Sequence, residues 1–115
     1  MSGLSTHVLD LAAGRPAARV AVQLHRETST PGVWEVVAER ETDDDGRVKD
    51  LIAAGQLRAG RYRLEFATGP YLEARGVASA FFPEVSVRFD VRDASAHVHV
   101  PLLLSPFGYS TYRGS

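Results

Sequence analysis

Apolar runs rich in Val, Leu, Phe and Tyr alternate along the chain with clusters of Gly, Pro and Asp. Short runs of this composition, bounded by turn residues, are typical of β-strands. The pattern predicts eight strands, near residues 5–10, 18–26, 33–41, 46–49, 61–67, 84–91, 95–104 and 107–112. Eight short strands joined by short turns favour an all-β sandwich.

Three segments between these runs have the composition of turns or of a helix. Ala-Gly-Arg-Pro at 13–16 predicts a turn from the first strand into the second. Asp-Asp-Asp-Gly at 43–46 predicts the closure of a hairpin in which Gly46 adopts a positive φ. Between residues 68 and 77, Pro70 fits a first helical turn and Gly76 fits the position just past a helix end. One short helix is therefore expected there.

Composition limits the class of protein. The chain has 115 residues, 44% of them hydrophobic and 23% charged, which predicts one globular domain over residues 1–115. The net charge of −1 offers no basic surface for nucleic acid. No apolar run approaches the roughly 18 residues of a membrane span, and the first residues lack the apolar core of a signal peptide. We therefore expect no membrane partner and a cytoplasmic protein.

Cysteine is absent, which excludes disulfides, thiolate metal sites and a cysteine nucleophile. A chain of this size buries only about two-thirds of its extended surface on folding. A large ligand cavity inside the core would remove much of what stabilises the fold. We therefore expect any ligand pocket to lie between subunits.

The segment 97–100 alternates imidazole and valine side chains. A period of two places His97 and His99 on one face of a strand and the two valines on the other. Such a pair binds zinc where a third ligand converges, and His7 is a candidate for that ligand. The spacing permits a metal site without requiring one. The other interpretation is exposed or hydrogen-bonded histidines, whose ordinary pKa suits general-base work.

The chain end is both aromatic and hydroxyl-rich, with the run Ser-Pro-Phe-Gly-Tyr-Ser-Thr-Tyr at 105–112. Pro106 and Gly108 predict a turn that joins two strands. An edge strand that bears Tyr109 and Tyr112 is expected to pair with a partner or to pack on one rather than to face water.

Five segments carry the pattern of a known family: Leu-Ser-Thr-His-Val-Leu-Asp at 4–10, Gly-Arg-Pro-Ala at 14–17, residues 42–47, His-Val-His-Val-Pro-Leu-Leu-Leu-Ser-Pro at 97–106, and Tyr-Arg-Gly-Ser at 112–115. Together they resemble the transthyretin-like proteins, in particular the 5-hydroxyisourate hydrolases, over the whole chain. The ending is the most specific segment, because the hormone-carrying transthyretins are similar up to about Thr111 and then continue in a longer tail. The residues His7, Arg47, His99 and Tyr112 likewise match the hydrolase pattern.

The resemblance implies an eight-stranded transthyretin-like sandwich with one short helix. Copies of it would pair edge to edge into a dimer and face to face into a homotetramer, with active sites in the channel between dimers. It also implies the hydrolysis of 5-hydroxyisourate to 2-oxo-4-hydroxy-4-carboxy-5-ureidoimidazoline, a step of urate degradation, with no metal and no cofactor.

On this resemblance, we expect His7 and His99 to share water activation and proton transfer. Arg47 is expected to hold ring oxygens and to stabilise developing negative charge. Ser115 would contribute its hydroxyl or the terminal carboxylate. The remaining candidates for substrate binding are Tyr112 and His97, and His25 is expected on plain surface.

The sequence is also compatible with three other functions and with a different mechanism. One is a carrier that binds small aromatic ligands in the same channel without chemistry. Another is a zinc-dependent hydrolase or zinc-binding protein that uses His7, His97 and His99. A third is a structural or interaction module. A covalent mechanism with Ser115 as nucleophile is less attractive, because no base and orienting group are identified for it.

Overall fold

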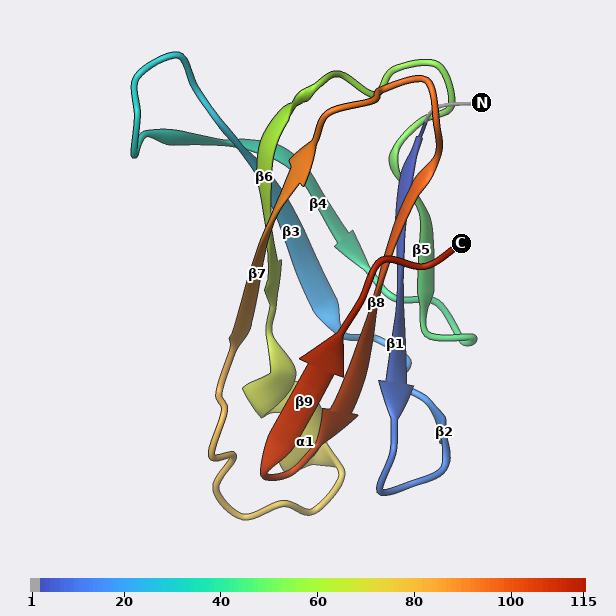
Figure 1. The fold of residues 1–115 in the computed structure, drawn as a ribbon. Helices are drawn as coiled ribbons and strands as arrows, with labels where there is room; N and C mark the ends of the chain where they lie inside the picture. The colour runs from blue at the N-terminus through green and yellow to red at the C-terminus, as the bar shows by residue number, and fades with distance from the viewer. Residues whose placement is uncertain (1–2) are drawn as a thin grey trace.

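Two β-sheets face each other across one apolar core in the computed structural model, which describes residues 3–115 (Figure 1). Sheet A has five strands in the order β2-β1-β8-β9, with β5 also paired to β1, and sheet B has four in the order β4-β3-β6-β7. The strands are β1 (Leu4–Asp10), β2 (Arg15–Pro16), β3 (Ala21–Glu27), β4 (Trp34–Glu41), β5 (Arg47–Ile52), β6 (Gly60–Phe66), β7 (Val85–Val91), β8 (Val98–Ser105) and β9 (Gly108–Thr111).

The core is filled by side chains that alternate along the strands. On β1, the side chains of Leu4, Thr6 and Val8 are fully buried, and the Thr6 hydroxyl donates to the Val100 carbonyl at 2.6 Å. The other fully buried large residues are Val20, Val22, Leu24, Tyr62, Leu64, Phe66, Leu72, Val85, Leu102 and Leu104. Because β-strand side chains alternate between faces, these inward positions turn Ser5 and His7 outward.

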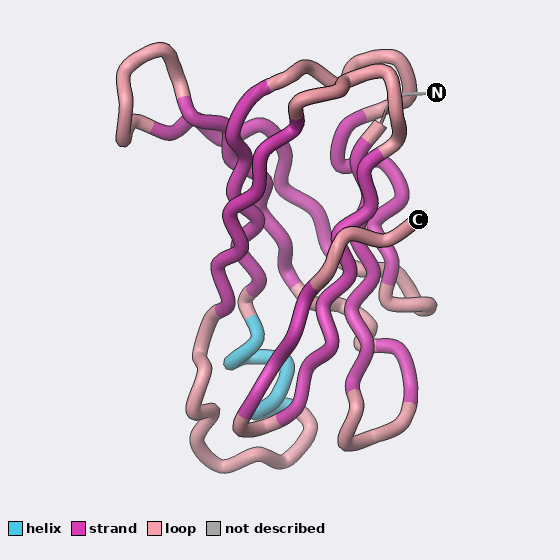
Figure 2. Tube along the Cα trace, in the orientation of Figure 1, coloured by secondary structure: helices cyan, strands magenta, loops and turns pink. Residues whose placement is uncertain are grey.

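The one helix within residues 3–115, α1 (Thr68–Ala74), lies at one end of the sandwich (Figure 2). Pro70 falls in its first turn, and Gly76 follows the C-cap residue Arg75 with a φ of 96°. The predicted short helix is thereby confirmed. Within residues 3–115, no helix has the length and apolar character needed to cross a membrane.

The predicted all-β sandwich is confirmed, and each of the eight predicted strands is present with shifted ends. The strand predicted at 95–104 begins at Val98, and the one predicted at 46–49 extends to Ile52. The predicted turn at 13–16 is only partly right. Its last two residues, Arg15 and Pro16, pair with Asp10 and Leu9 of β1 as the short strand β2.

The hairpin predicted at 43–46 is wrong, although Gly46 adopts the expected positive φ of 74°. The strands on either side of this turn belong to different sheets, since β4 pairs with β3 while β5 pairs with β1. The buried Thr42 hydroxyl accepts the Val20 N–H at 2.8 Å and donates to the Ala17 carbonyl at 2.7 Å, which ties the end of β4 to the start of β3. The acidic turn then carries the chain across to sheet A.

Candidate active site

The registers of β5 and β8 on β1 bring distant polar residues to one place on the outward face of sheet A. Strands β1 and β8 run parallel, and Ser5 lies opposite His99. On the other side of β1, the antiparallel strand β5 places Arg47 opposite His7. The inward-facing residues of these strands are core, so the polar residues share the outward face.

Ser5 links the two histidines of the alternating segment. Its Oγ lies 2.8 Å from Nε2 of His97 and 2.8 Å from Nδ1 of His99, which confirms that both imidazoles share a face. Ser5 is only 9% exposed. A hydroxyl has one proton, so Ser5 donates to one imidazole and accepts from the other.

His7 is held by the acidic turn beside it. Its Nε2 lies 2.8 Å from the Asp45 carbonyl oxygen. A carbonyl only accepts hydrogen bonds, so His7 Nε2 carries a hydrogen and Nδ1 is the acceptor of the neutral ring. The turn itself is ordered by the Asp43 carboxylate, which accepts the backbone N–H groups of Arg47 and Asp45 at 2.9 Å each. The hydrogen bond from Arg47 is the main reason that the Asp43 pKa is lowered.

The C-terminal tail lies against His99 from the side opposite β1. The Gly114 N–H donates to the His99 carbonyl at 2.8 Å, and the two residues form an isolated antiparallel bridge. A Cβ on Gly114 would stand 2.6 Å from Cδ2 of the His99 ring. Only glycine therefore lets the tail approach this imidazole so closely, and the approach brings Ser115 to the polar face.

These residues surround an open hollow of about 570 Å³, lined by Ser5, Thr6, Arg47, Lys49, His97, His99 and Ser115. Of the residues proposed from sequence, Arg47, His97, His99 and Ser115 line it, whereas His7 lies beside it next to Arg47. Sequence reasoning missed Ser5 and Lys49. A strand period of two offered the signal for both, because Ser5 precedes His7 by two residues and Lys49 follows Arg47 by two.

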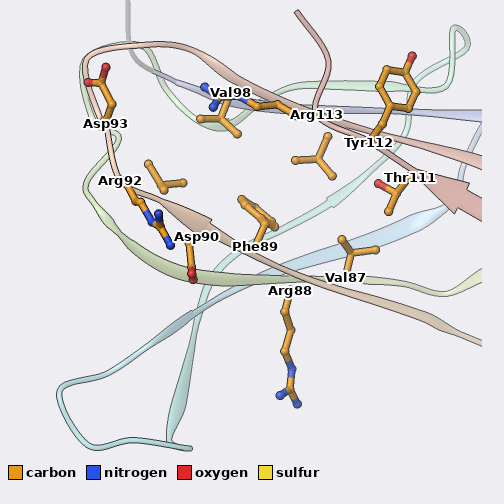
Figure 3. A pocket seen from close by; sticks show the side chains of 12 residues that line it. Val87, Arg88, Phe89, Asp90, Arg92, Asp93, Val98, Thr111, Tyr112 and Arg113 are labelled. Carbon is orange, nitrogen blue, oxygen red and sulfur yellow. The ribbon is translucent and has the colours of Figure 1, made fainter.

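Tyr112 lines a different hollow in the single chain. That hollow, of about 530 Å³, lies between β7 and the β8–β9 side of sheet A and includes Val87, Phe89, Val98 and Val100. Figure 3 shows the Tyr112 ring pointing away from Phe89 and Val87. The ring is 55% exposed. The register pairs Leu102 with Thr111 and His99 with Gly114. Tyr112 therefore lies between these two pairs, where the chain continues past the end of β9.

The electrostatics of the hollow disfavour a charged His99. Burial lowers the pKa of this imidazole, and the positive charge of Arg47 lowers it further, followed by smaller effects of His7 and His97. Within residues 3–115, no ion pair involves Arg47 or Lys49. His99 is therefore held toward its neutral, proton-accepting form beside two unpaired cations.

The histidines within residues 3–115 form no common metal site, and one of them is buried. No group of three or more His, Cys, Asp or Glu among residues 3–115 has the geometry to hold a metal ion, so His7, His97 and His99 do not converge as one ligand set. His25 was expected on plain surface, and this is wrong. It is buried on β3, where Nδ1 accepts hydrogen bonds from the Arg63 guanidinium at 3.1 and 2.9 Å.

Comparisons with known proteins agree on the relationships of this chain. Residues 4–114 match the model of the HIUase/Transthyretin family. The 5-hydroxyisourate hydrolase of Caulobacter vibrioides is 48% identical over 118 residues, which covers 100% of both chains. The solved 5-hydroxyisourate hydrolase of Klebsiella pneumoniae has 39% identity and a TM-score of 0.85 with 100% of both chains covered. The solved transthyretin of Sparus aurata has 35% identity and a TM-score of 0.89, covering 99% of this chain and 97% of its own.

Proposed function

This chain belongs to the HIUase/Transthyretin family and hydrolyses 5-hydroxyisourate, and we propose that it does so at the hollow on the outward face of β1, β5 and β8. The product is 2-oxo-4-hydroxy-4-carboxy-5-ureidoimidazoline, which forms when water opens a lactam ring of the substrate. The choice of this site rests on one observation. The hollow joins a half-buried, proton-accepting imidazole to an unpaired guanidinium.

The first task of this reaction is to make water nucleophilic. His99 is suited to it because its lowered pKa keeps the ring neutral near pH 7. His7 shares in the activation of water, with Nε2 committed to the Asp45 carbonyl and Nδ1 left to accept a hydrogen bond from the attacking water. General acid–base catalysis of this kind contributes about 10² to 10⁴-fold in rate.

The second task is to stabilise negative charge on the attacked carbonyl oxygen. Arg47 presents a planar fork of N–H donors that matches a carbonyl and a neighbouring oxygen. Lys49 adds a second cation to the rim of the hollow. The new carboxylate of the product is an anion as well, so the same two cations favour the products of ring opening.

The remaining site residues complete the substrate pocket. Ser115 reaches the hollow through the tail that Gly114 pins to His99, and it offers a hydroxyl or a terminal carboxylate to a ring nitrogen. Tyr112 precedes this tail and borders the channel in the assembly proposed next. His97 lies at the exposed rim of the hollow.

We propose further that four copies assemble as a dimer of dimers. Strands β7 and β9 are the end strands of their sheets and flank the same 530 Å³ hollow. Unpaired strand edges and exposed aromatic rings favour association, and Phe81, Phe107 and Tyr109 are 67%, 78% and 42% exposed on this side. Pairing of two copies at these edges extends both sheets. Two dimers that face each other through sheet A would then close the open active-site hollow against water.

Sedimentation velocity tests this assembly. The wild-type chain is expected to sediment with the mass of four chains. Tyr109→Asp, which places a charge on the end strand β9, should dissociate it. Val36→Asp is the matched control, because Val36 is 57% exposed on the opposite end strand β4. A wild-type monomer, or dissociation by Val36→Asp alone, would contradict the assembly.

The activity is tested by adding the purified chain to freshly generated 5-hydroxyisourate and following the loss of its ultraviolet absorbance. The expected result is a decay much faster than the spontaneous reaction. Decay at the spontaneous rate, together with retention of the ligand by the protein, would instead indicate a carrier. Pretreatment with a chelator should leave the rate unchanged, and a loss of rate would support the zinc-dependent alternative.

A further inference from the structure

The hydrolysis proposed above gives His99 two opposite tasks within one turnover. It must first take a proton from water as the O–C bond forms, and then give a proton to the leaving nitrogen as the C–N bond breaks. In between, a simple base would hold a full positive charge. Burial and the Arg47 guanidinium both oppose that charge. A route that moves the charge away from His99 would therefore lower the barrier.

Ser5 and His97 offer such a route. Nδ1 of His99 contacts Ser5 Oγ at 2.8 Å, and the same oxygen contacts Nε2 of His97 at 2.8 Å. The three groups run from a half-buried ring through a buried hydroxyl to an exposed ring. We propose that Ser5 and His97 form a proton relay that switches His99 between its two neutral tautomers, so that it acts first as base and then as acid.

The proton positions balance at each step. At the start, His99 Nδ1–H donates to Ser5, Ser5 donates to His97 Nε2, and His97 carries its other hydrogen on Nδ1 toward solvent. When water loses a proton to His99 Nε2, the Nδ1 proton passes to Ser5 and the Ser5 proton passes to His97, which releases its Nδ1 proton to solvent. His99 is then neutral with its hydrogen on Nε2.

The return step uses the same hydrogen bonds in reverse. His99 gives its Nε2 proton to the leaving nitrogen while Nδ1 regains one from Ser5, Ser5 takes one from His97, and His97 takes one from solvent. The starting tautomers are restored. The second proton of the attacking water leaves when the new carboxylic acid ionises, so no further proton donor is required.

The groups around His99 explain why positive charge moves from His99 to His97. The charged and titratable groups that face it are His7 from β1, Arg47 and Lys49 from β5, His97 before β8, and Ser115 from the tail. Arg47 and Lys49 both lie on β5, across β1 from β8. His97 lies at the solvent end, where water stabilises an imidazolium. Positive charge is thus less costly on His97 than on His99.

Ser5 is a positioning residue in this scheme, so its test needs a readout that a purely structural role would not move. Ser5→Ala removes the hydroxyl and is expected to lower kcat by about 10²-fold, the low end for acid–base catalysis, with little change in KM. Ser5→Thr keeps a hydroxyl and should restore most of kcat. His97→Ala should also lower kcat, and added imidazole should raise it again in a saturable way, because a free imidazole can accept the proton from Ser5.

Ring ¹⁵N NMR of the histidines separates failure of the relay from failure of the proposed activity. In the wild-type protein, His97 and His99 should show linked tautomers, and Ser5→Ala should change the tautomer of His99 whatever the substrate is. A wild-type chain without activity would defeat the proposed function, while linked tautomers would still support the relay. An active wild type whose Ser5→Ala and His97→Ala variants keep full kcat without response to imidazole would overturn it.

Discussion

The outward faces of the two sheets each carry a histidine beside an arginine. The arginine of sheet B forms an ion pair with a carboxylate, whereas that of sheet A forms none within residues 3–115. On sheet B, Arg63 donates to His25 and forms an ion pair with Glu65 at 3.2 Å. The other side of the His25 ring hydrogen-bonds Gln23 at 3.0 Å, and Gln23 donates to Glu39 at 2.7 Å. On sheet A, no ion pair within residues 3–115 neutralises Arg47 or Lys49.

The difference separates a structural histidine from a candidate catalytic one. Both ring nitrogens of His25 already have hydrogen-bond partners in the chain, so this imidazole has no free nitrogen to offer a ligand. The cations next to His99 act on whatever enters the hollow, because no carboxylate within residues 3–115 forms an ion pair with them. The number of histidines and arginines on a face is therefore less informative than whether their charges are already paired.

Replacing the two histidines gives the largest expected contrast. His99→Asn should lower kcat/KM by about 10² to 10⁴-fold, because the proposed proton carrier is lost, while the fold and the proposed tetramer should persist. His25→Asn should leave kcat/KM unchanged and instead lower the free energy of unfolding by about 1 kcal/mol through a lost hydrogen bond. The measurements are steady-state kinetics and denaturant unfolding. Loss of activity in His25→Asn with wild-type stability would contradict a structural role for His25 on sheet B and a catalytic role for His99 on sheet A.

The sequence predicted which residues line the candidate site better than it predicted their arrangement. The alternation at 97–100 places both imidazoles outward, and this holds because Val98 and Val100 are core residues. The partner of His99 was not predictable, because Ser5 lies 94 residues away and reaches it through a parallel pairing of the first strand with a late one. Hydrophobic periodicity assigns a face to each residue, but it does not determine strand order.

The two wrong predictions have a related cause. The burial of His25 is not predictable from local sequence, because it depends on Arg63 and Gln23, and Arg63 comes from another strand. The turn at 43–46 has the composition of a hairpin, yet long-range contacts of Thr42 and of β5 decide which sheets it connects. Local composition identified the turn and its glycine, whereas tertiary contacts determined the connection.

An intermediate effect is expected from the glycine that lets the tail approach His99. In Gly114→Ala, the new Cβ would meet the His99 ring at 2.6 Å, so the ring or the tail must move. Displacement of a catalytic group by about 1 Å costs roughly 10 to 100-fold, and kcat/KM should fall by that factor with little loss of stability at the chain end. Gly108→Ala is the matched control, since its nearest neighbour would be Ser105 Oγ at 3.8 Å. Equal activity of the two variants would show that the tail does not position the imidazole.

The smallest expected effect is a change in the charge state of His99. It is tested with matched substitutions of Arg47 on sheet A and Arg63 on sheet B. Arg47 is the second cause, after burial, of the lowered His99 pKa. Arg47→Gln should therefore raise that pKa toward 6.5, the ordinary value of histidine, as followed by the NMR titration of the ring Cε1–H. The acid limb of the kcat/KM profile should move to higher pH by the same amount, and the plateau should be lower because Arg47 is also proposed to bind substrate.

The pH dependence of the free energy of unfolding gives an independent check on the direction of the His99 pKa shift. A histidine whose pKa is lowered in the folded state contributes stability that is present above the unfolded pKa and is lost as the pH falls from 6.5 toward the folded value. Arg47→Gln brings the folded pKa of His99 closer to its unfolded pKa. The free energy of unfolding of this variant should therefore fall less steeply as the pH is lowered than that of the wild type. Arg63→Gln on sheet B should leave the His99 titration unchanged. A shift of equal size in both variants would mean that the unpaired guanidinium of sheet A has no special influence on the imidazole beside it.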